Sequence, residues 1–237
     1  MSESPLTKYK KAWPVLFHIT PVTNLDRLRA THRLESAAAL LGGSEHQAIL
    51  SHRRLADATF HRDGFEVTIR SQSPLHESDI ELIGGWSFAD YLRELNSRVF
   101  FWPGTWAGPN PYGQRHRASR VNEAAALLRL SLQDLLSTNP GLAPHLSRFN
   151  TGAARQYFGR RSPRGPETFI AAGGWPYAPS RVAEVSFVGA VNLPDTVEFQ
   201  AIGATSWTAL FLGDDSETPV NPRLKRADTA LSRGPAA

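Results

Sequence analysis

Two positions in the sequence combine a reactive residue type with a suitable setting, and the first is a histidine. His18 lies in the apolar run Leu16-Phe17-His18-Ile19-Thr20, which has the composition of a strand. Thr23 and Asp26 follow with the spacing of a helix capping box, so the strand is expected to end there. A histidine at a strand end can exchange protons or bind a ligand. The alternative is a core histidine whose nitrogen atoms are satisfied within the fold.

The second position is a carboxylate inside an apolar segment. Glu184 lies in Val182-Ala183-Glu184-Val185-Ser186-Phe187-Val188, which is expected to be a strand. Burial of a carboxylate is costly unless its charge is paired or used. Glu184 therefore faces either a cleft that needs the charge or the solvent side of a one-sided strand.

Arginine is concentrated in two clusters, although the chain has only 26 basic against 22 acidic residues. The first cluster contains Arg115, His116, Arg117 and Arg120, and the second contains Arg148, Arg155, Arg160, Arg161 and Arg164. The planar guanidinium suits bidentate contacts with phosphate, so the clusters fit a dinucleotide or a polynucleotide. The alternative is a pair of solvated basic loops.

The motifs of several enzyme classes are missing from the sequence. It has no Gly-x-x-x-x-Gly-Lys phosphate loop, no Gly-x-Gly-x-x-Gly, no Gly-x-Ser-x-Gly and no His-Glu-x-x-His. Cysteine is absent and the eight histidines lack ligand spacing, so we expect no metal site and no thiol chemistry. No apolar stretch has the length of a membrane span and the N-terminus does not resemble a secretory signal, so we expect a cytoplasmic protein without membrane contact.

Local patterns predict the elements that position these residues. Capping boxes predict helices that begin at Ser44 and at Ser87, the second with an inward stripe of Phe88, Tyr91, Leu92 and Leu95. Alternation predicts a half-buried strand over 65–70 after a turn at Asp63-Gly64, and an aromatic run predicts a buried strand over 98–102 that Pro103-Gly104 ends. Residues 124–136 mix helix and strand signals, and further strands are expected at 146–149 and 196–202.

This order of short helices followed by strands predicts an α+β fold. With 41% apolar residues the chain can bury one core, and we expect a single domain over residues 1–212. The sequence beyond Gly213 is polar and contains proline, which predicts a flexible C-terminal tail over 213–237.

Two segments resemble the DarT-type ADP-ribosyltransferase toxins, which modify DNA bases with NAD. Phe17-His18-Ile19-Thr20 with Asn24-Leu25 is similar to their first strand, and Arg181 to Pro194 is similar to the strand that bears their catalytic glutamate. A second resemblance, to a group of bacterial proteins of unassigned function, covers about residues 13 to 200. It includes Leu95 to Trp102, Arg148-Phe149-Asn150-Thr151-Gly152-Ala153 and Arg164-Gly165-Pro166-Glu167-Thr168-Phe169.

The resemblance implies an ADP-ribosyltransferase-like split β-sheet core with short N-terminal helices, in which two small sheets enclose a cleft for NAD as the consumed substrate. It implies that Glu184 is catalytic, since a carboxylate stabilises the oxocarbenium-like sugar formed when nicotinamide leaves. His18 with Thr20 would contact the adenosine-side ribose. The family's arginine cannot be matched directly, because Pro103-Gly104 stands in its place, and Arg98 or Arg70 is the nearest substitute.

Four further residues are candidate NAD contacts because of the chemistry of their side chains. Phe101 and Trp102 can stack on nicotinamide or a base, although only one of them can face the cleft if the strand is regular. Asn150 and Thr151 follow a predicted strand and can bind NAD hydroxyls, or they can form an ordinary turn.

The expected function is a mono-ADP-ribosyltransferase, as a toxin or defence effector that modifies nucleic acid and has an antitoxin partner. The alternatives are an NAD glycohydrolase and a non-catalytic module of the same fold that binds nucleic acid or a protein partner.

Overall fold

The computed structural model describes residues 3–42, 49–156 and 158–211 of the 237-residue chain. The helix predicted to begin at Ser44 and the tail predicted over residues 213–237 lie outside the described residues.

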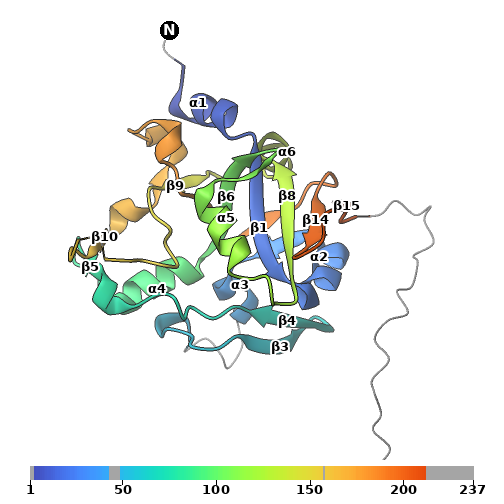
Figure 1. The fold of residues 1–237 in the computed structure, drawn as a ribbon, viewed down its shortest axis with the longest axis horizontal. Coiled ribbons are helices and arrows are strands. Elements are labelled where there is room, and N and C mark those ends of the chain that lie inside the picture. The colour runs from blue at the N-terminus through green and yellow to red at the C-terminus, as the bar shows by residue number, and fades with distance from the viewer. Residues whose placement is uncertain (1–2, 43–48, 157, 212–237) are drawn as a thin grey trace, which may run out of the picture.

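Most strands belong to one antiparallel sheet, with β1, β6 and β8 at its centre (Figure 1). In spatial order the sheet contains β11 (Ile170–Ala171), β9 (His145–Ser147), β12 (Glu184–Val188), β6 (Arg98–Thr105), β1 (Val15–Pro21), β8 (Ala125–Ser131), β14 (Glu198–Ala201) and β15 (Thr208–Ala209). β7 (Gly108–Pro109) pairs with the end of β6. The most N-terminal strand, β1, therefore lies in the middle of the sheet, between two later strands.

The sheet forks between β1 and β6. Val15, Leu16 and Phe17 of β1 pair with Gly104, Pro103 and Trp102 of β6. From His18 onward β1 keeps its ladder with β8 but has none with β6. The first half of β6 instead pairs, on its opposite edge, with β12. The two central strands thus diverge at His18, and this divergence opens the middle of the sheet.

The described residues also form six α-helices and three small sheets. The helices are α1 (Pro5–Ala12), α2 (Leu25–Thr31), α3 (Ala37–Leu41), α4 (Phe88–Asn96), α5 (Pro111–Ala118) and α6 (Leu132–Thr138). The small sheets pair β2 (Arg33–Glu35) with β13 (Ala190–Asn192), β3 (Ala58–Arg62) with β4 (Phe65–Ile69), and β5 (Ile80–Leu82) with β10 (Ser162–Arg164). Short 3₁₀ helices are η1 (Val22–Asn24), η3 (Glu77–Asp79), η4 (Pro166–Thr168), η5 (Ala172–Gly174) and η6 (Pro179–Arg181).

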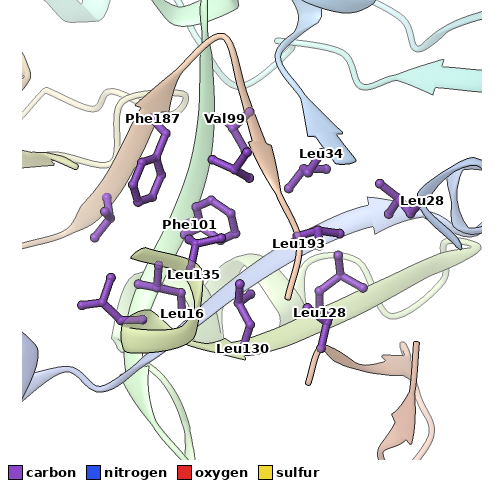
Figure 2. Close-up of a cluster of buried hydrophobic side chains, with 14 of the residues drawn as sticks. Leu16, Leu28, Leu34, Val99, Phe101, Leu128, Leu130, Leu135, Phe187 and Leu193 are labelled. Carbon is purple, nitrogen blue, oxygen red and sulfur yellow. The ribbon is translucent and has the colours of Figure 1, made fainter. Parts of the chain in front are cut away.

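The largest hydrophobic core covers one face of the main sheet (Figure 2). Leu16 from β1, Leu128 from β8 and Phe101 from β6 contribute to it from the sheet, and Leu135 of α6 and Leu34 of β2 are part of the same cluster. Each fully buried side chain of this size stabilises the fold by about 1.5–3 kcal/mol. A second cluster joins α4 to β5 through Tyr91, Leu92 and Ile80. A third cluster, which includes Val15 and Phe17 of β1 and Leu127 of β8, covers the opposite face of the central strands, so these strands are packed on both faces.

The predicted α+β class is confirmed, whereas the predicted ADP-ribosyltransferase-like split core stays a prediction. The structure has one main sheet with a fork, because β6 is long enough to pair with β1 in its second half and with β12 in its first. Pro103-Gly104 does not end this strand as predicted, since β6 continues to Thr105. A Cβ at Gly104 would lie 2.3 Å from the Gly108 carbonyl oxygen, so this glycine permits the tight β6–β7 hairpin.

Several local predictions are confirmed. α4 has the expected capping box of Ser87 and Asp90, and β4 follows a turn in which Asp63 and Gly64 both have positive φ. The mixed segment 124–136 resolves into β8 followed directly by α6. The predicted Thr23 capping box is wrong, because Thr23 lies within η1 and its hydroxyl donates to Thr68 Oγ1 at 3.2 Å instead.

Candidate functional site

A cleft of about 300 Å³ is lined by residues on both sides of the fork. This volume is at the lower end of the range of small-molecule sites, roughly 300–1,000 Å³. Eight of the nine predicted site residues line it: His18, Thr20, Arg70, Arg98, Trp102, Asn150, Thr151 and Glu184. The fold therefore brings the two residues singled out first, His18 and Glu184, into one cavity.

Glu184 begins β12 and is buried, with 4% of its surface exposed. One of its oxygen atoms, Oε2, accepts two hydrogen bonds from Thr151, one from the backbone N–H at 3.0 Å and one from the hydroxyl at 2.6 Å. Burial raises the pKa of Glu184 to about 7, against the opposing effects of these hydrogen bonds and of the Arg164 charge. The solvent-facing alternative for Glu184 is thus not what the structure has, and the carboxyl group can gain or lose a proton near neutral pH.

His18 is held by the backbone at the fork. Its Nδ1 lies 2.8 Å from the carbonyl oxygen of Phe100. Burial, opposed by the hydrogen bond to Phe100 and assisted by the nearby charge of Arg70, lowers the pKa of His18 to about 4, so the ring is neutral at physiological pH. Because a carbonyl oxygen can only accept, Nδ1 carries the proton and Nε2 has a free lone pair. His18 can therefore accept a hydrogen bond from a ligand hydroxyl but does not bring a positive charge.

Thr20 and Asn24 connect β1 to the β3–β4 hairpin. The Asn24 side chain donates to the Thr20 hydroxyl at 3.1 Å and to the Thr68 carbonyl at 3.0 Å, and its own carbonyl accepts from the Thr68 N–H at 2.8 Å. One side chain thus satisfies both backbone groups of a residue in β4, as a neighbouring strand would. These hydrogen bonds hold the β3–β4 hairpin, which leads to Arg70, against the cleft.

Two arginines share one carboxylate at the edge of the cleft. Arg70 and Arg120 donate to opposite oxygens of Glu123, at 2.8 and 2.6 Å. Both arginines line the cleft, and Nε of each is buried without a hydrogen-bond partner. Burial, together with the charges of Arg120 and Arg70, lowers the pKa of nearby His116 to about 4, so this ring is also neutral. The cluster of Arg70, Arg120, Glu123 and His116 therefore carries an excess positive charge.

Arg98 also lines the cleft, but its charge is already paired. Its guanidinium makes an ion pair with Glu94, including a hydrogen bond from Nε at 2.9 Å, and lies 4.3 Å from the centre of the Phe169 ring. A further hydrogen bond of 3.4 Å reaches the Ser186 hydroxyl. These contacts hold the guanidinium in place beside β12, and the catalytic role predicted for it stays a prediction.

Of the two aromatic candidates, only Trp102 borders the cleft. Phe101 is 1% exposed and packs edge-on against Phe187 in the core, with ring centroids 5.9 Å apart. Phe101 pairs with Val185 of β12, and both side chains lie on the core face of the sheet. The prediction that Phe101 contacts a cofactor is therefore wrong. The Trp102 ring lies 4.7 Å from that of His116, where it can contact a ligand.

Several lining residues were not singled out as site residues in the sequence. His116 and Arg120 belong to the first basic cluster, but only the fold shows that they turn toward the cleft. Arg54 and Asn96 are joined by a hydrogen bond of 2.8 Å on its wall. His116 and Arg120 are four residues apart at the end of α5, whereas Arg54 and Asn96 come from separate parts of the chain that no sequence motif relates.

Two absences concern only the part of the chain that the structure describes. Within residues 3–42, 49–156 and 158–211, no group of three or more His, Cys, Asp or Glu side chains is arranged to hold a metal ion. Over the same ranges, none of the helices has both the length and the apolar character needed to cross a bilayer.

The chain matches a known protein family over most of its length. Residues 14–197 match the model of a family of unknown function (DUF7002). This agrees in extent with the predicted resemblance to proteins of unassigned function, and it provides no link to ADP-ribosyltransferases. No curated protein matches the chain.

Proposed function

Because the chain belongs to a family of unknown function (DUF7002), we propose its activity from the geometry of the cleft: it is an NAD-dependent mono-ADP-ribosyltransferase. The observation that carries the proposal is that His18 and the buried carboxyl group of Glu184 line one cavity at a fork in the sheet. The two sequence segments that resemble the ADP-ribosyltransferase toxins contain these two residues.

In this reaction the bond between the ribose C1′ and the nicotinamide nitrogen breaks, and its electron pair leaves with neutral nicotinamide. The sugar becomes an oxocarbenium-like cation. Glu184 accepts a hydrogen bond from the ribose 2′-hydroxyl, and its negative charge stabilises the cation in a site with little water. The acceptor then bonds to C1′ and its proton passes to the carboxylate. A group with a pKa of about 7 suits this transfer at neutral pH.

The other side chains support a dinucleotide in the cleft. Neutral His18 accepts a hydrogen bond from a hydroxyl of the adenosine ribose through Nε2, with Thr20 beside it. Arg70 and Arg120 line the cleft with an excess positive charge, which can offset the negative charge of the diphosphate. Trp102 offers a ring face to nicotinamide or to an acceptor base, and Asn150 and Thr151 lie beside Glu184 for hydroxyl contacts.

We propose nucleic acid as the acceptor, in the role of a toxin or defence effector that an antitoxin protein would restrain. The support is the surplus of arginine, of which Arg148, Arg155, Arg160 and Arg161 are exposed and can contact phosphates. Water as the acceptor would make the protein an NAD glycohydrolase. A module that has lost the chemistry would bind its partner without consuming NAD.

One assay separates these three activities. The protein is incubated with NAD labelled in the adenine, alone and with single-stranded DNA, double-stranded DNA, RNA or protein, and nicotinamide, free ADP-ribose and labelled polymer are measured. Transfer predicts nicotinamide release with label on one polymer, and hydrolysis predicts equimolar free ADP-ribose. If neither product appears with any acceptor and NAD causes no thermal shift, the proposed activity is wrong. The Glu184→Gln variant is the matched control for contaminating enzymes.

A further inference from the structure

Arg164 is the largest side chain that is fully buried in the described structure, with 1% of its surface exposed. It forms no ion pair with an acidic side chain among residues 3–42, 49–156 and 158–211. Its guanidinium donates to the Ser162 hydroxyl at 2.6 Å and the Pro163 carbonyl at 2.9 Å, and lies 4.3 Å from the centre of the Phe149 ring. A buried cation without a direct counter-ion is costly, so a use for its charge is expected.

Two further hydrogen bonds connect Arg164, directly or through Tyr91, to Asn150 and Thr151, and Thr151 is the residue that donates to Glu184. Its Nε donates to the hydroxyl of Tyr91 at 3.0 Å, and that hydroxyl donates to the Thr151 carbonyl at 2.9 Å. Its Nη2 donates to the Asn150 carbonyl at 3.3 Å. Burial keeps the pKa of Tyr91 well above its usual value, so the hydroxyl retains the proton that it donates. Arg164 thus fixes the carbonyl groups on both sides of Thr151.

The peptide between Asn150 and Thr151 lies between the two charges. Its carbonyl oxygen accepts from Arg164, and its N–H donates to Glu184 Oε2 at 3.0 Å. The positive end of the peptide dipole therefore points at the carboxylate and the negative end at the guanidinium. Hydrogen bonds in such a series polarise one another, and the effect is larger where water is excluded.

We propose that Arg164 is a positioning residue: acting through Tyr91 and the Asn150–Thr151 peptide, it fixes the orientation of the Glu184 carboxylate and supplies the buried positive charge that lets it ionise. The catalytic meaning of this arrangement rests on the proposed function, whereas the coupling between the two residues does not. Arg164 itself is separated from the carboxylate by the peptide and acts through it.

Other titratable groups surround this end of the cleft from three elements. Tyr91 of α4 stays protonated, and Arg98 of β6 is compensated by Glu94. His145 of β9 pairs with β12 two residues beyond Glu184, and burial lowers its pKa, as does the charge of Arg98. None of these groups donates to the Glu184 carboxylate, whereas Thr151, which Arg164 holds, donates twice.

The test measures the ionisation of Glu184 directly, without reference to activity. The chain is labelled with glutamate carrying ¹³C at the side-chain carboxyl carbon, and the Glu184 signal is identified as the one missing in Glu184→Gln. Arg164→Met is expected to move the titration midpoint of that signal up by about one pH unit, because the opposing charge is lost. Arg164→Lys should raise the midpoint less than Arg164→Met does, since lysine retains the positive charge. Arg161→Met, which removes an exposed arginine from the same cluster, should leave the midpoint unchanged.

Tyr91→Phe is the second variant, because it keeps the charge and the packing and removes only the hydroxyl link. It should broaden or shift the Glu184 signal and, if the protein cleaves NAD, reduce kcat about tenfold with little change in KM. Circular dichroism checks that each variant folds, and if Arg164→Met does not, Arg164→Lys and Tyr91→Phe decide. An unchanged Glu184 midpoint and signal in the folded Arg164 and Tyr91 variants overturns the inference. If the midpoint moves but the wild-type protein does not consume NAD, the coupling stands and only the proposed function fails.

Discussion

Replacement of Glu184 by glutamine should make the protein more stable at pH 8 while it abolishes most of its activity. The amide oxygen of glutamine can accept the same two hydrogen bonds from Thr151, so the packing is retained. What is lost is a buried negative charge. The two effects therefore separate the contribution of Glu184 to the fold from its contribution to chemistry.

The magnitude follows from the pKa of the carboxyl group. Burial raises the pKa of Glu184 from its usual 4.5 to about 7. Between these two pH values the folded state holds a proton that the unfolded state has released, so stability falls as the pH rises from 4.5 through 7. At about 1.4 kcal/mol for each pH unit, the loss reaches about 3 kcal/mol at pH 8. Glutamine avoids this loss, and for a chain of this size the gain corresponds to a rise in Tm of about 6–12 °C.

Thermal denaturation of both proteins at pH 8 and at pH 4.5 tests the stability, and release of nicotinamide from NAD tests the activity. We expect a higher Tm for Glu184→Gln at pH 8 and a much smaller difference at pH 4.5. Nicotinamide release should fall by a factor of about 10²–10³ or more, with NAD binding retained. A Tm at pH 8 below that of the wild type would refute the reasoning from burial. Unchanged nicotinamide release would refute the catalytic assignment.

Three further predictions concern the cleft wall. His18→Ala should weaken NAD binding about tenfold by calorimetry with little change in kcat, and a large loss of kcat at saturating NAD would contradict a binding role. Arg120→Gln should weaken the binding of NAD and ADP-ribose, more at low salt, but not that of adenosine, and equal effects on all three would argue against a diphosphate contact. Asn24→Ala should destabilise the protein by about 1–3 kcal/mol and speed amide exchange in the β3–β4 hairpin, and normal protection of Thr68 would show that the hairpin does not depend on this side chain.

The local elements of the fold are predictable because their causes are local. The capping box at Ser87 depends on residues three positions apart, and the turn at Asp63-Gly64 depends on two adjacent residues that tolerate positive φ. The two leading candidates were visible for a similar reason. His18 and Glu184 stand out because polar groups in apolar strands need an explanation.

The fork in the sheet could not be predicted, because it depends on which strands become neighbours across long stretches of chain. The orientation of Phe101 and Trp102 could not be predicted either. Alternation shows that the two side chains lie on opposite faces of the sheet, but only the pairing of β6 with β12 shows which face packs into the core. Arg164 was hidden for a different reason. It lies in an arginine-rich stretch that is typical of a solvated loop, and only the tertiary contacts show that its charge is enclosed.

Where β1 and β6 stop pairing, backbone N–H and C=O groups inside the sheet are left without the inter-strand hydrogen bonds that such groups normally make. One of them, the carbonyl of Phe100, is taken by an imidazole from the opposite strand. Peptide groups have the same donors and acceptors whatever side chain they carry, so the polar character of this gap survives most amino-acid replacements. Variation among related sequences will therefore alter the walls of the opening more readily than the opening itself.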